Sequence, residues 1–465
     1  MAPRTLLDKL WDSHEILQRA DGSALLWVDR HLVHEGSHHG FAKIAARDLP
    51  VAEPDLTFAV VDHYAPTRGR PTPRNDVATM IERLRKNAHA HKVRLFDLKD
   101  PRQGIVHVLG PEQGLTLPGS LVLCGDSHTS THGALGALAF GIGATEVAHV
   151  LATQTIWQTR PRSLRLTIQG QLSASVTAKD IALTWIAKLG ADGARGYAIE
   201  YAGPVVRALS AEARMTLCNL SIEGGAKLGL IAPDDVTFAY LKGRAFAPSD
   251  ADWDAALKEW SALPSDPDAI FDREESLEAG DIAPTLTWGT SPEDALPITS
   301  DVPNPDHFSA THAARIRDTL HYMGLDAGKP LAGTPVDQVF IGSCTNGRIE
   351  DLRLAAAVPA GRTAKIGGLV SPGSMPVKHQ AEQEGLHHIF TDAGLDWVDP
   401  GCSMCVGMNG DLVAPGKRCA SSTNRNFRGR QGPGARTHLM SPAMVAAAAV
   451  TGALSDVRPL LAGRM

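Results

Sequence analysis

The stretch VDQVFIGSCTN, residues 336–346, points to the fold class of this 465-residue chain. Val336 to Ile341 is a short apolar run, which predicts a buried strand. Gly342 interrupts the run, and a helical pattern follows from about Arg348 to Val358. Strand, glycine break and helix in this order are typical of α/β folds, whose ligand sites lie beyond the carboxyl ends of the strands. We therefore expect Cys344, just past such an end, at a ligand site.

The same alternation recurs along the chain. Ser120 to Cys124 predicts a strand, and a helical pattern of small residues follows from Ala134 to Gln154. Ser163 to Gln169 and Ala178 to Leu189 predict a further strand and helix, and Glu212 to Leu228 predicts one more helix. Such alternation predicts parallel α/β domains.

The length suggests about three domains. We predict an N-terminal α/β domain over 1–160, a middle α/β domain with a linker over 161–310, and a third α/β domain over 311–465. Residues 246–306 are rich in Asp, Pro, Ala and Ser and lack periodicity, which predicts a linker-like connection. The apolar run 443–450 is too short to span a bilayer and predicts a buried helix.

Composition and charge argue against several classes of function. The formal net charge is −6, and lysines and arginines are dispersed, which argues against a nucleic-acid partner. The N-terminal residues carry charges throughout, so neither a signal peptide nor a membrane span is expected. Six cysteines in a chain of this length do not form a disulfide framework. We expect a cytoplasmic protein without a membrane partner.

Three cysteines offer a set of soft metal ligands. Cys402 and Cys405 form a C-x-x-C pair, and Cys344 is a distant third thiol. Three thiolates can hold an iron–sulfur cube and leave one iron open to act as a Lewis acid. Zinc with a histidine as fourth ligand, or a thiol redox pair, also fits this spacing. A four-thiolate electron carrier would need one of the remaining cysteines, which we expect to be small buried residues: Cys124, Cys218 and Cys419.

Carboxylates stand beside histidines at several places. Asp126, Ser127 and His128 share one turn, Asp62 precedes His63, and His107 lies in another segment. A carboxylate beside a histidine fixes its tautomer and raises its basicity, as proton transfer requires. A helix N-cap is the structural alternative for Asp126 and Ser127.

Other polar side chains have spacings that suit ligand binding. Asn219 and Glu223, four residues apart in the predicted helix, would lie on one face. Arg425 and Arg430 bracket a turn rich in Asn and Gly, and their guanidinium groups offer forks to carboxylates. A solvated basic loop is the alternative. Residues 30–35, RHLVHE, suggest either a metal site or a loop at a pocket edge.

These motifs together resemble the aconitase superfamily, and within it the large-subunit family of the 3-isopropylmalate dehydratases. The similarity extends over nearly the whole chain. It is carried by residues 29–35, 104–114, 124–154, 339–353, 400–409 and 419–432.

The resemblance implies an aconitase-like fold of three α/β domains around a central iron–sulfur cluster, without the fourth, swivelling domain. It implies one [4Fe-4S] cluster on Cys344, Cys402 and Cys405. It implies catalytic roles for Asp62, His63, His107, Asp126, Ser127, His128 and Glu223, and substrate binding by Arg30, His31, Asn219, Asn424, Arg425 and Arg430.

The implied reaction removes water from a 2-substituted malate and adds it back with the hydroxyl on the neighbouring carbon. For this family the dicarboxylate substrates are 2- and 3-isopropylmalate, in leucine biosynthesis. We expect His63 to be the acid, with His107 and His128 as rival proton carriers. A small partner subunit would supply the swivelling domain and its catalytic serine.

Some positions depart from the family pattern, namely Tyr64-Ala65-Pro66, Gly36 to Phe41, and Gly347. They leave open a sister isomerase for homocitrate, a citramalate-type substrate or an aryl-malate. An RNA-binding regulator is a further alternative, against which the mild acidity and the lack of a basic stripe argue.

Overall fold

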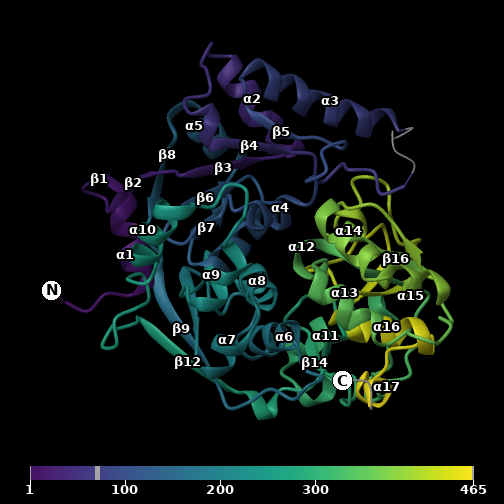
Figure 1. The fold of residues 1–465 in the computed structure, drawn as a ribbon. Helices are drawn as coiled ribbons and strands as arrows, with labels where there is room; N and C mark the ends of the chain where they lie inside the picture. Colours follow the sequence, from purple (N-terminus) through teal and green to yellow (C-terminus); the bar gives the residue numbers. More distant parts are fainter. Residues whose placement is uncertain (1, 69–73, 463–465) are drawn as a thin grey trace. The chain divides into compact units, whose positions relative to one another are not determined.

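The computed structural model describes residues 2–68 and 74–462 as helices and mostly parallel strands, which confirms the predicted α/β class (Figure 1). Internal contacts divide the chain into two units. Unit 1 comprises residues 1–170 and 194–277, and unit 2 comprises residues 171–193 and 278–465. The limits predicted at 160 and 310 differ from these boundaries, and the division into three domains stays a prediction.

The main sheet of unit 1 has five parallel strands in the order β5-β4-β3-β6-β7. The chain proceeds outward from β3 through β4 to β5 and then returns to build β6 and β7 beside β3. The strand order therefore reverses between β3 and β6, the position where open α/β sheets bind ligands. The strands are β3 (Arg30–Val33), β4 (Thr57–Val60), β5 (Arg94–Phe96), β6 (Leu121–Cys124) and β7 (Leu138–Gly141).

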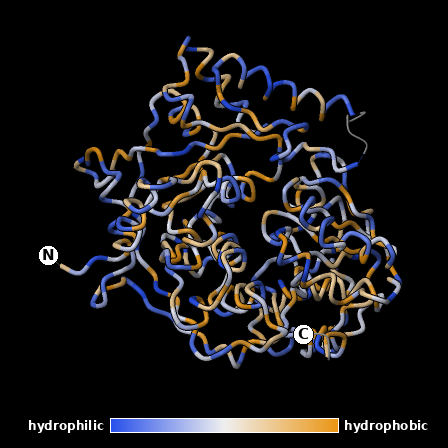
Figure 2. The backbone as a smooth tube through the Cα atoms, in the orientation of Figure 1, coloured by the Kyte–Doolittle hydropathy of each residue, from blue (hydrophilic) through white to orange (hydrophobic). Residues whose placement is uncertain are grey.

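Helices cover this sheet, and its inner strands are apolar. All four residues of β4 and of β6 are buried, as is typical of parallel strands covered on both faces. The long helix α3 buries one stripe, Val77, Ile81, Leu84 and Ala88, and is otherwise largely hydrophilic in Figure 2. The helices in this part are α2 (His38–Ala45), α3 (Asn75–Ala90), α4 (Val106–Gln113) and α5 (Ala144–Thr153).

Unit 1 contains two further sheets. One is antiparallel, in the order β1-β2-β8, and the other has the order β11-β10-β9-β12, in which β9, β10 and β11 are parallel. The strands are β1 (Glu15–Gln18), β2 (Ser23–Trp27), β8 (Thr155–Thr159), β9 (Arg162–Gln169), β10 (Tyr197–Ala202), β11 (Leu228–Ile231) and β12 (Arg273–Glu278). The helices are α1 (Leu6–His14), α7 (Pro204–Ala208), α8 (Ala211–Leu220), α9 (Asp235–Leu241) and α10 (Asp250–Trp260), with 3-10 helices including η1 (Glu35–Ser37), η3 (Ser127–Leu135) and η4 (Ser221–Gly224).

Unit 2 repeats the winding pattern of the main sheet. Its five parallel strands have the order β17-β16-β15-β18-β19, so the order reverses between β15 and β18. The strands are β15 (Gln338–Ile341), β16 (Gly368–Val370), β17 (Asp396–Trp397), β18 (Arg418–Ser421) and β19 (Arg436–Leu439), with an antiparallel pair β13 (Thr285–Thr287) and β14 (Ala295–Pro297). The helices are α6 (Ala178–Leu189), α11 (Ala310–Met323), α12 (Ser343–Asn346), α13 (Ile349–Ala356), α14 (Met375–Gln383), α15 (Leu386–Asp392), α16 (Pro442–Thr451) and α17 (Arg458–Leu461).

Several local predictions are confirmed. The strand and helix predicted over 163–189 are β9 and α6, and the strand predicted at 120–124 is β6. The apolar run 443–450 lies in α16, whose first eight residues are buried in the core of unit 2. Cys124, Cys218 and Cys419 are buried free thiols, as expected. In the described ranges, no helix combines the length and apolarity that a bilayer crossing requires.

Three local predictions were wrong. The helix predicted from 134 to 154 is instead η3, strand β7 and helix α5, because Gly136, in the left-handed region, ends η3. The helix predicted from 212 to 228 ends at Leu220, and left-handed Gly225 leads into β11. The supposed linker 246–306 contains α10, β12, β13 and β14. Only Trp253 and Trp260 of α10 are buried, which explains its weak apolar pattern.

Candidate active site

Polar side chains follow three neighbouring strands of the main sheet in unit 1. His34 and Glu35 follow β3, Asp62 and His63 follow β4, and Asp126 follows β6. The strands are parallel, so these residues emerge at one edge of the sheet, where the strand order reverses.

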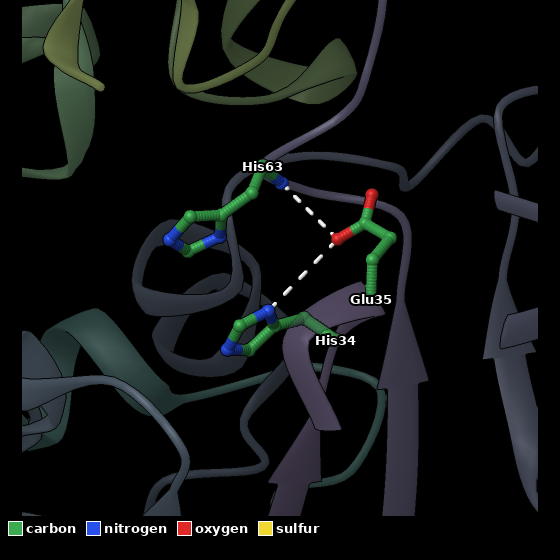
Figure 3. A group of neighbouring side chains, drawn as sticks. All are labelled: His34, Glu35 and His63. Carbon is green, nitrogen blue, oxygen red and sulfur yellow. Dashed lines mark hydrogen bonds and ion pairs between the residues drawn. The ribbon is translucent and has the colours of Figure 1, made fainter. Parts of the chain in front are cut away.

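Glu35 organises the loop that carries Asp62 and His63 (Figure 3). Its carboxylate accepts hydrogen bonds from the backbone N–H groups of Asp62 at 2.9 Å, His63 at 3.2 Å and Tyr64 at 3.2 Å. The side chain is 1% exposed, and its burial raises the pKa of Glu35 to about 7. Three backbone donors on one carboxylate fix the direction in which the loop presents the His63 ring.

The His63 ring lies between two carboxylates. Its Nδ1 is 3.4 Å from an oxygen of Asp62, and its Nε2 is 3.3 Å from an oxygen of Asp126. Burial opposes protonation, but Asp62 and Asp126 outweigh it and hold the pKa of His63 well above its usual value. The two carboxylates therefore favour the protonated form of His63, as a candidate proton donor requires.

His34 stacks on His63 with ring centroids 4.4 Å apart and planes 15° apart (Figure 3). Burial, and then the charge of His63, lower the pKa of His34 to about 4, so its 3.9 Å approach to Glu35 is not an ion pair. The backbone N–H of Gly36 donates to His34 Nδ1 at 3.1 Å, which puts the ring proton on Nε2. That nitrogen is buried without a hydrogen-bond partner among the described residues, and it is available to a ligand.

Asp126 lies close to three imidazole rings. It caps η3 by accepting from the backbone N–H of His128 at 2.7 Å, so the predicted N-cap is confirmed. One of its oxygens is 3.3 Å from His128 Nδ1 and 3.7 Å from His107 Nε2. Burial raises the pKa of Asp126, but His107, His128 and His63 outweigh it and hold this pKa well below its usual value.

Glu223 and His132 extend the polar network. His128 Nε2 is 3.0 Å from Glu223 of η4. His107 Nδ1 is 3.0 Å from His132 Nε2, and His132 Nδ1 is 2.5 Å from the Thr116 hydroxyl. If Thr116 donates to His132, then His132 donates to His107, whose own proton on Nε2 faces Asp126. The two rings and the Thr116 hydroxyl thus form one continuous chain of hydrogen bonds that fixes the tautomer of His107.

Asn219 and Ser127 lie at the edge of this network. The Asn219 amide on α8 donates to Thr131 Oγ1 of η3 at 2.8 Å, and Thr131 in turn donates to the His128 carbonyl at 2.6 Å. Ser127 is the first residue of η3. Asn219 thus holds the turn that presents His128, and Ser127 adjoins it.

Unit 2 brings its thiols to the strand ends where its own order reverses. Cys344 follows β15, Cys402 and Cys405 follow β17, and Asn424 follows β18. The Asn424 amide nitrogen is 3.6 Å from Cys344 Sγ, and its oxygen is 3.5 Å from Cys405 Sγ. One amide thus touches two thiols from separate loops, and Cys402 is 7% exposed.

The backbone beside two of these cysteines is strained. Ser343, just before Cys344, has φ of 79°, and Ser403, just after Cys402, has φ of 47°. The left-handed region costs a residue with a side chain about 1–2 kcal/mol, and such strain concentrates at functional sites. Close packing at position 347 explains one departure from the family pattern, Gly347. A Cβ there would lie 2.8 Å from the Ser343 carbonyl oxygen.

A buried lysine ties these loops together. Lys179 of α6 is fully buried and donates to Asn346 Oδ1 at 3.1 Å, to Thr423 O at 2.6 Å and to the carbonyl of Ser422. The Asn346 amide donates to Asp351 at 2.9 Å. Burial lowers the pKa of Lys179 to about 7, and the nearby Asp351, Cys405 and Cys344 oppose this shift.

Two candidate substrate-binding arginines lie in the loop after β18. Arg430 lies over the Phe427 ring, with 5.5 Å between its guanidinium carbon and the ring centre, and has no ion-pair partner among the described residues. Arg425 is half-buried beside Asn424. By contrast, Arg428 is paired with Asp318.

The structure does not bring Arg30 and His31 to the histidine cluster. They are the first two residues of β3, at the end of the strand opposite to His34. His31 is fully buried, and burial lowers its pKa to about 3. The sequence analysis named His34 and Glu35 only within residues 30–35, as a metal site or a loop at a pocket edge, and it missed His132. In the sequence, His34 and Glu35 come directly after a strand, and His132 lies four residues after His128.

A family model and a curated relative both match nearly the whole of this chain. The model of the aconitase family (aconitate hydratase) matches residues 8–452. A curated relative, the 3-isopropylmalate dehydratase large subunit 1 of Bradyrhizobium diazoefficiens, is 54% identical over 462 residues, which cover 98% of this chain and 97% of the relative. Among solved structures, Thermococcus kodakaraensis aconitase X in its holo-form matches with 10% identity and a TM-score of 0.46, over 90% of this chain and 89% of that one.

Proposed function

This chain belongs to the aconitase family, and we propose from that premise that it is the large subunit of a 3-isopropylmalate dehydratase. This hydro-lyase interconverts 2- and 3-isopropylmalate in leucine biosynthesis through an alkene intermediate. The observation that carries the proposal is the position of the His63 ring, whose two nitrogens lie 3.4 Å from Asp62 and 3.3 Å from Asp126. A relative that is 54% identical over nearly its full length bears this name.

Aconitase-family enzymes use an iron–sulfur cluster, and we assign one [4Fe-4S] cluster to Cys344, Cys402 and Cys405. The residues fit this group, because all three thiols are buried and free and Asn424 contacts two of them. An iron without a protein ligand supplies Lewis-acid polarisation of the substrate hydroxyl. The hydrogen bonds of Lys179 and the strained serines would keep the loops that carry the thiolates in place.

The residues of unit 1 carry out proton transfer in this proposal. In dehydration, the C–O bond breaks as His63 gives its proton to the departing hydroxyl, and water forms. A base removes the proton from the neighbouring carbon, and the alkene results. Hydration reverses these steps with the hydroxyl on the other carbon. An acid positioned in this way accelerates its step by about 10²–10⁴.

His128 and His107 would recharge His63 through Asp126, which faces all three rings. We assign Asp62 and Glu223 to hold rings in place, and Ser127 and Asn219 to the same edge of the site. The Nε2–H of His34 is a buried donor without a partner among the described residues, and we assign it to a substrate oxygen.

We assign the carboxylates of the substrate to Arg425, Arg430 and Asn424. Arg430 suits this role because its guanidinium is stacked but not paired with an acid. A guanidinium fork binds a carboxylate with two parallel hydrogen bonds.

A small subunit completes the proposed enzyme, as the name of the relative implies. We propose that it carries the swivelling domain and the serine that takes the carbon-bound proton. Since the six cysteines are free, the proposed compartment is the reducing cytoplasm.

A turnover assay tests the proposal. The chain is reconstituted anaerobically with iron and sulfide, mixed with its co-purifying small subunit, and offered 2-isopropylmalate, homocitrate, citramalate and an aryl-malate while alkene absorbance is recorded. We expect the highest kcat/KM for isopropylmalate, and a loss of about 10²–10⁴ in His63→Asn but not in the exposed His39→Asn. Preference for another malate would overturn the leucine assignment, and an active His63→Asn would overturn the role of His63.

A further inference from the structure

A basic pocket opens in unit 1 at the amino ends of the main-sheet strands. Its volume is about 550 Å³, and Arg30, Asp55, Phe58, Lys92, Arg94 and Phe246 line it. Arg30 is the first residue of β3 and Arg94 is the first of β5. The histidine cluster follows the carboxyl ends of the same sheet, so the pocket is a separate site at the opposite edge.

The register of the sheet explains why these side chains converge. Phe58 of β4 pairs with Leu32 of β3 on one side and with Arg94 of β5 on the other. Arg30 lies two residues before Leu32. Because side chains alternate along a strand, Arg30, Phe58 and Arg94 project from the same face. The positions of the cations are therefore set by strand pairing rather than by a mobile loop.

The three cations of the pocket lack acidic partners. Within residues 2–68 and 74–462, no ion pair involves Arg30, Lys92 or Arg94. Arg30 donates from Nη1 to the Asp29 carbonyl at 2.7 Å, and its Nε is buried without a hydrogen-bond partner. Burial lowers the pKa of Arg30, although the charge of nearby Asp29 opposes the shift, so the guanidinium is poorly solvated.

Aromatic rings hold the Arg94 guanidinium in position. Phe246 packs edge-on against Phe58, with ring centres 5.5 Å apart and planes at 79°. The Arg94 guanidinium lies 5.1 Å over the Phe246 ring. The backbone N–H of Phe246 donates to the Gln113 carbonyl at 2.9 Å, which anchors the ring. A stacked guanidinium loses less conformational freedom on binding than a free one.

We propose that this pocket binds a small multivalent oxyanion, held by Arg30, Lys92 and Arg94, with its apolar part against Phe58 and Phe246. With one acid, Asp55, against three cations, the lining carries two net positive charges. Carboxylate and phosphate groups share the oxygen pattern that guanidinium forks recognise. The ligand is therefore a polycarboxylate or a phosphate-bearing metabolite, bound apart from the histidine cluster.

Isothermal titration of the purified chain tests the site. Pyrophosphate and citrate are the two probes, titrated at fixed ionic strength so that general screening is constant. The variant Lys92→Gln/Arg94→Gln removes two exposed cations of the pocket. The matched control Arg83→Gln/Lys86→Gln removes two exposed cations of the adjacent helix α3.

We expect saturable binding of at least one probe, weakened about a hundredfold in the pocket variant, or about tenfold for each lost charge-assisted contact, and unchanged in the control. Stronger binding of pyrophosphate would identify a phosphate ligand, and stronger binding of citrate a carboxylate. Absence of saturable binding, or equal affinity in both double variants, would overturn the proposal. All four substituted side chains are exposed, and equal thermal transitions without ligand would show that the variants are folded.

Discussion

Replacement of Asp126 by Asn tests the electrostatic account of His63 most directly. Asn has nearly the same shape as Asp, and its oxygen can still accept from the backbone N–H of His128, which Asp126 binds at 2.7 Å. What the variant loses is a negative charge 3.3 Å from His63 Nε2 and 3.3 Å from His128 Nδ1. The perturbation is therefore mainly one of charge.

The expected magnitude follows from Coulomb's law. Two unit charges about 3.3 Å apart interact with about 5 kcal/mol at an effective dielectric constant of about 20. Asp62, at 3.4 Å, remains in the variant and keeps part of the stabilisation. We expect the pKa of His63 to fall, so that the acid is lost at a lower pH and the alkaline limb of kcat/KM moves to lower pH.

The pH dependence of stability has a definite sign. The raised pKa of His63 contributes stability that is complete below its unfolded value of 6.5 and is lost as pH rises through the folded pKa. The lowered pKa of Asp126 contributes stability above its unfolded value of 3.8, and this stability is lost as pH falls through the folded pKa. Asp126→Asn should therefore lower the free energy of unfolding most between about pH 4 and 6.5.

The assay is kcat/KM of the reconstituted two-subunit enzyme from pH 6 to pH 10, paired with denaturant unfolding of the chain alone. The control is Asp254→Asn, an exposed residue of α10 without an ion pair among the described residues. An alkaline limb in Asp126→Asn that coincides with that of the native enzyme would refute the argument.

Three further perturbations have distinct readouts. Asn424→Ala removes the amide that contacts Cys344 and Cys405, and we expect faster loss of iron in air, followed by iron content over time; an unchanged rate would argue against the contact. Arg430→Lys loses the planar fork, and we expect KM to rise about tenfold or more with a smaller change in kcat; an effect on kcat alone would contradict substrate binding. Gly133→Ala would place a Cβ 1.9 Å from the Gly229 carbonyl oxygen, and we expect at least about 1–3 kcal/mol of destabilisation in urea unfolding; an unchanged midpoint would show that the two segments separate easily.

Much of the fold was predictable where a strand was short, apolar and closed by a polar turn. Residues 336–346 showed both the strand β15 and the break after it, and the structure has Ser343–Asn346 as a short helix directly beyond. The failures have two causes. A buried strand of four residues, such as β7, has no period that distinguishes it from helix. Helix α10 buries only two residues, which are too few to give a recognisable apolar period.

The candidate site was predictable only where its chemistry was local in sequence. Asp62 and His63 are adjacent, so their pairing was visible, whereas the partners of Glu35 lie 27 to 29 residues away. His132 was missed because its role depends on His107 and Thr116, which are distant in the chain. The resemblance assigned Arg30 to substrate binding, and only the direction of β3 shows that it lies at the other edge of the sheet.

The left-handed serines beside Cys344 and Cys402 have a consequence for how the protein tolerates substitution. Each serine holds a backbone conformation that costs about 1–2 kcal/mol, so the packing of unit 2 must supply that energy. A substitution that loosens this packing far from the thiols would let the two turns relax, and the sulfur atoms beside them would lose their fixed positions.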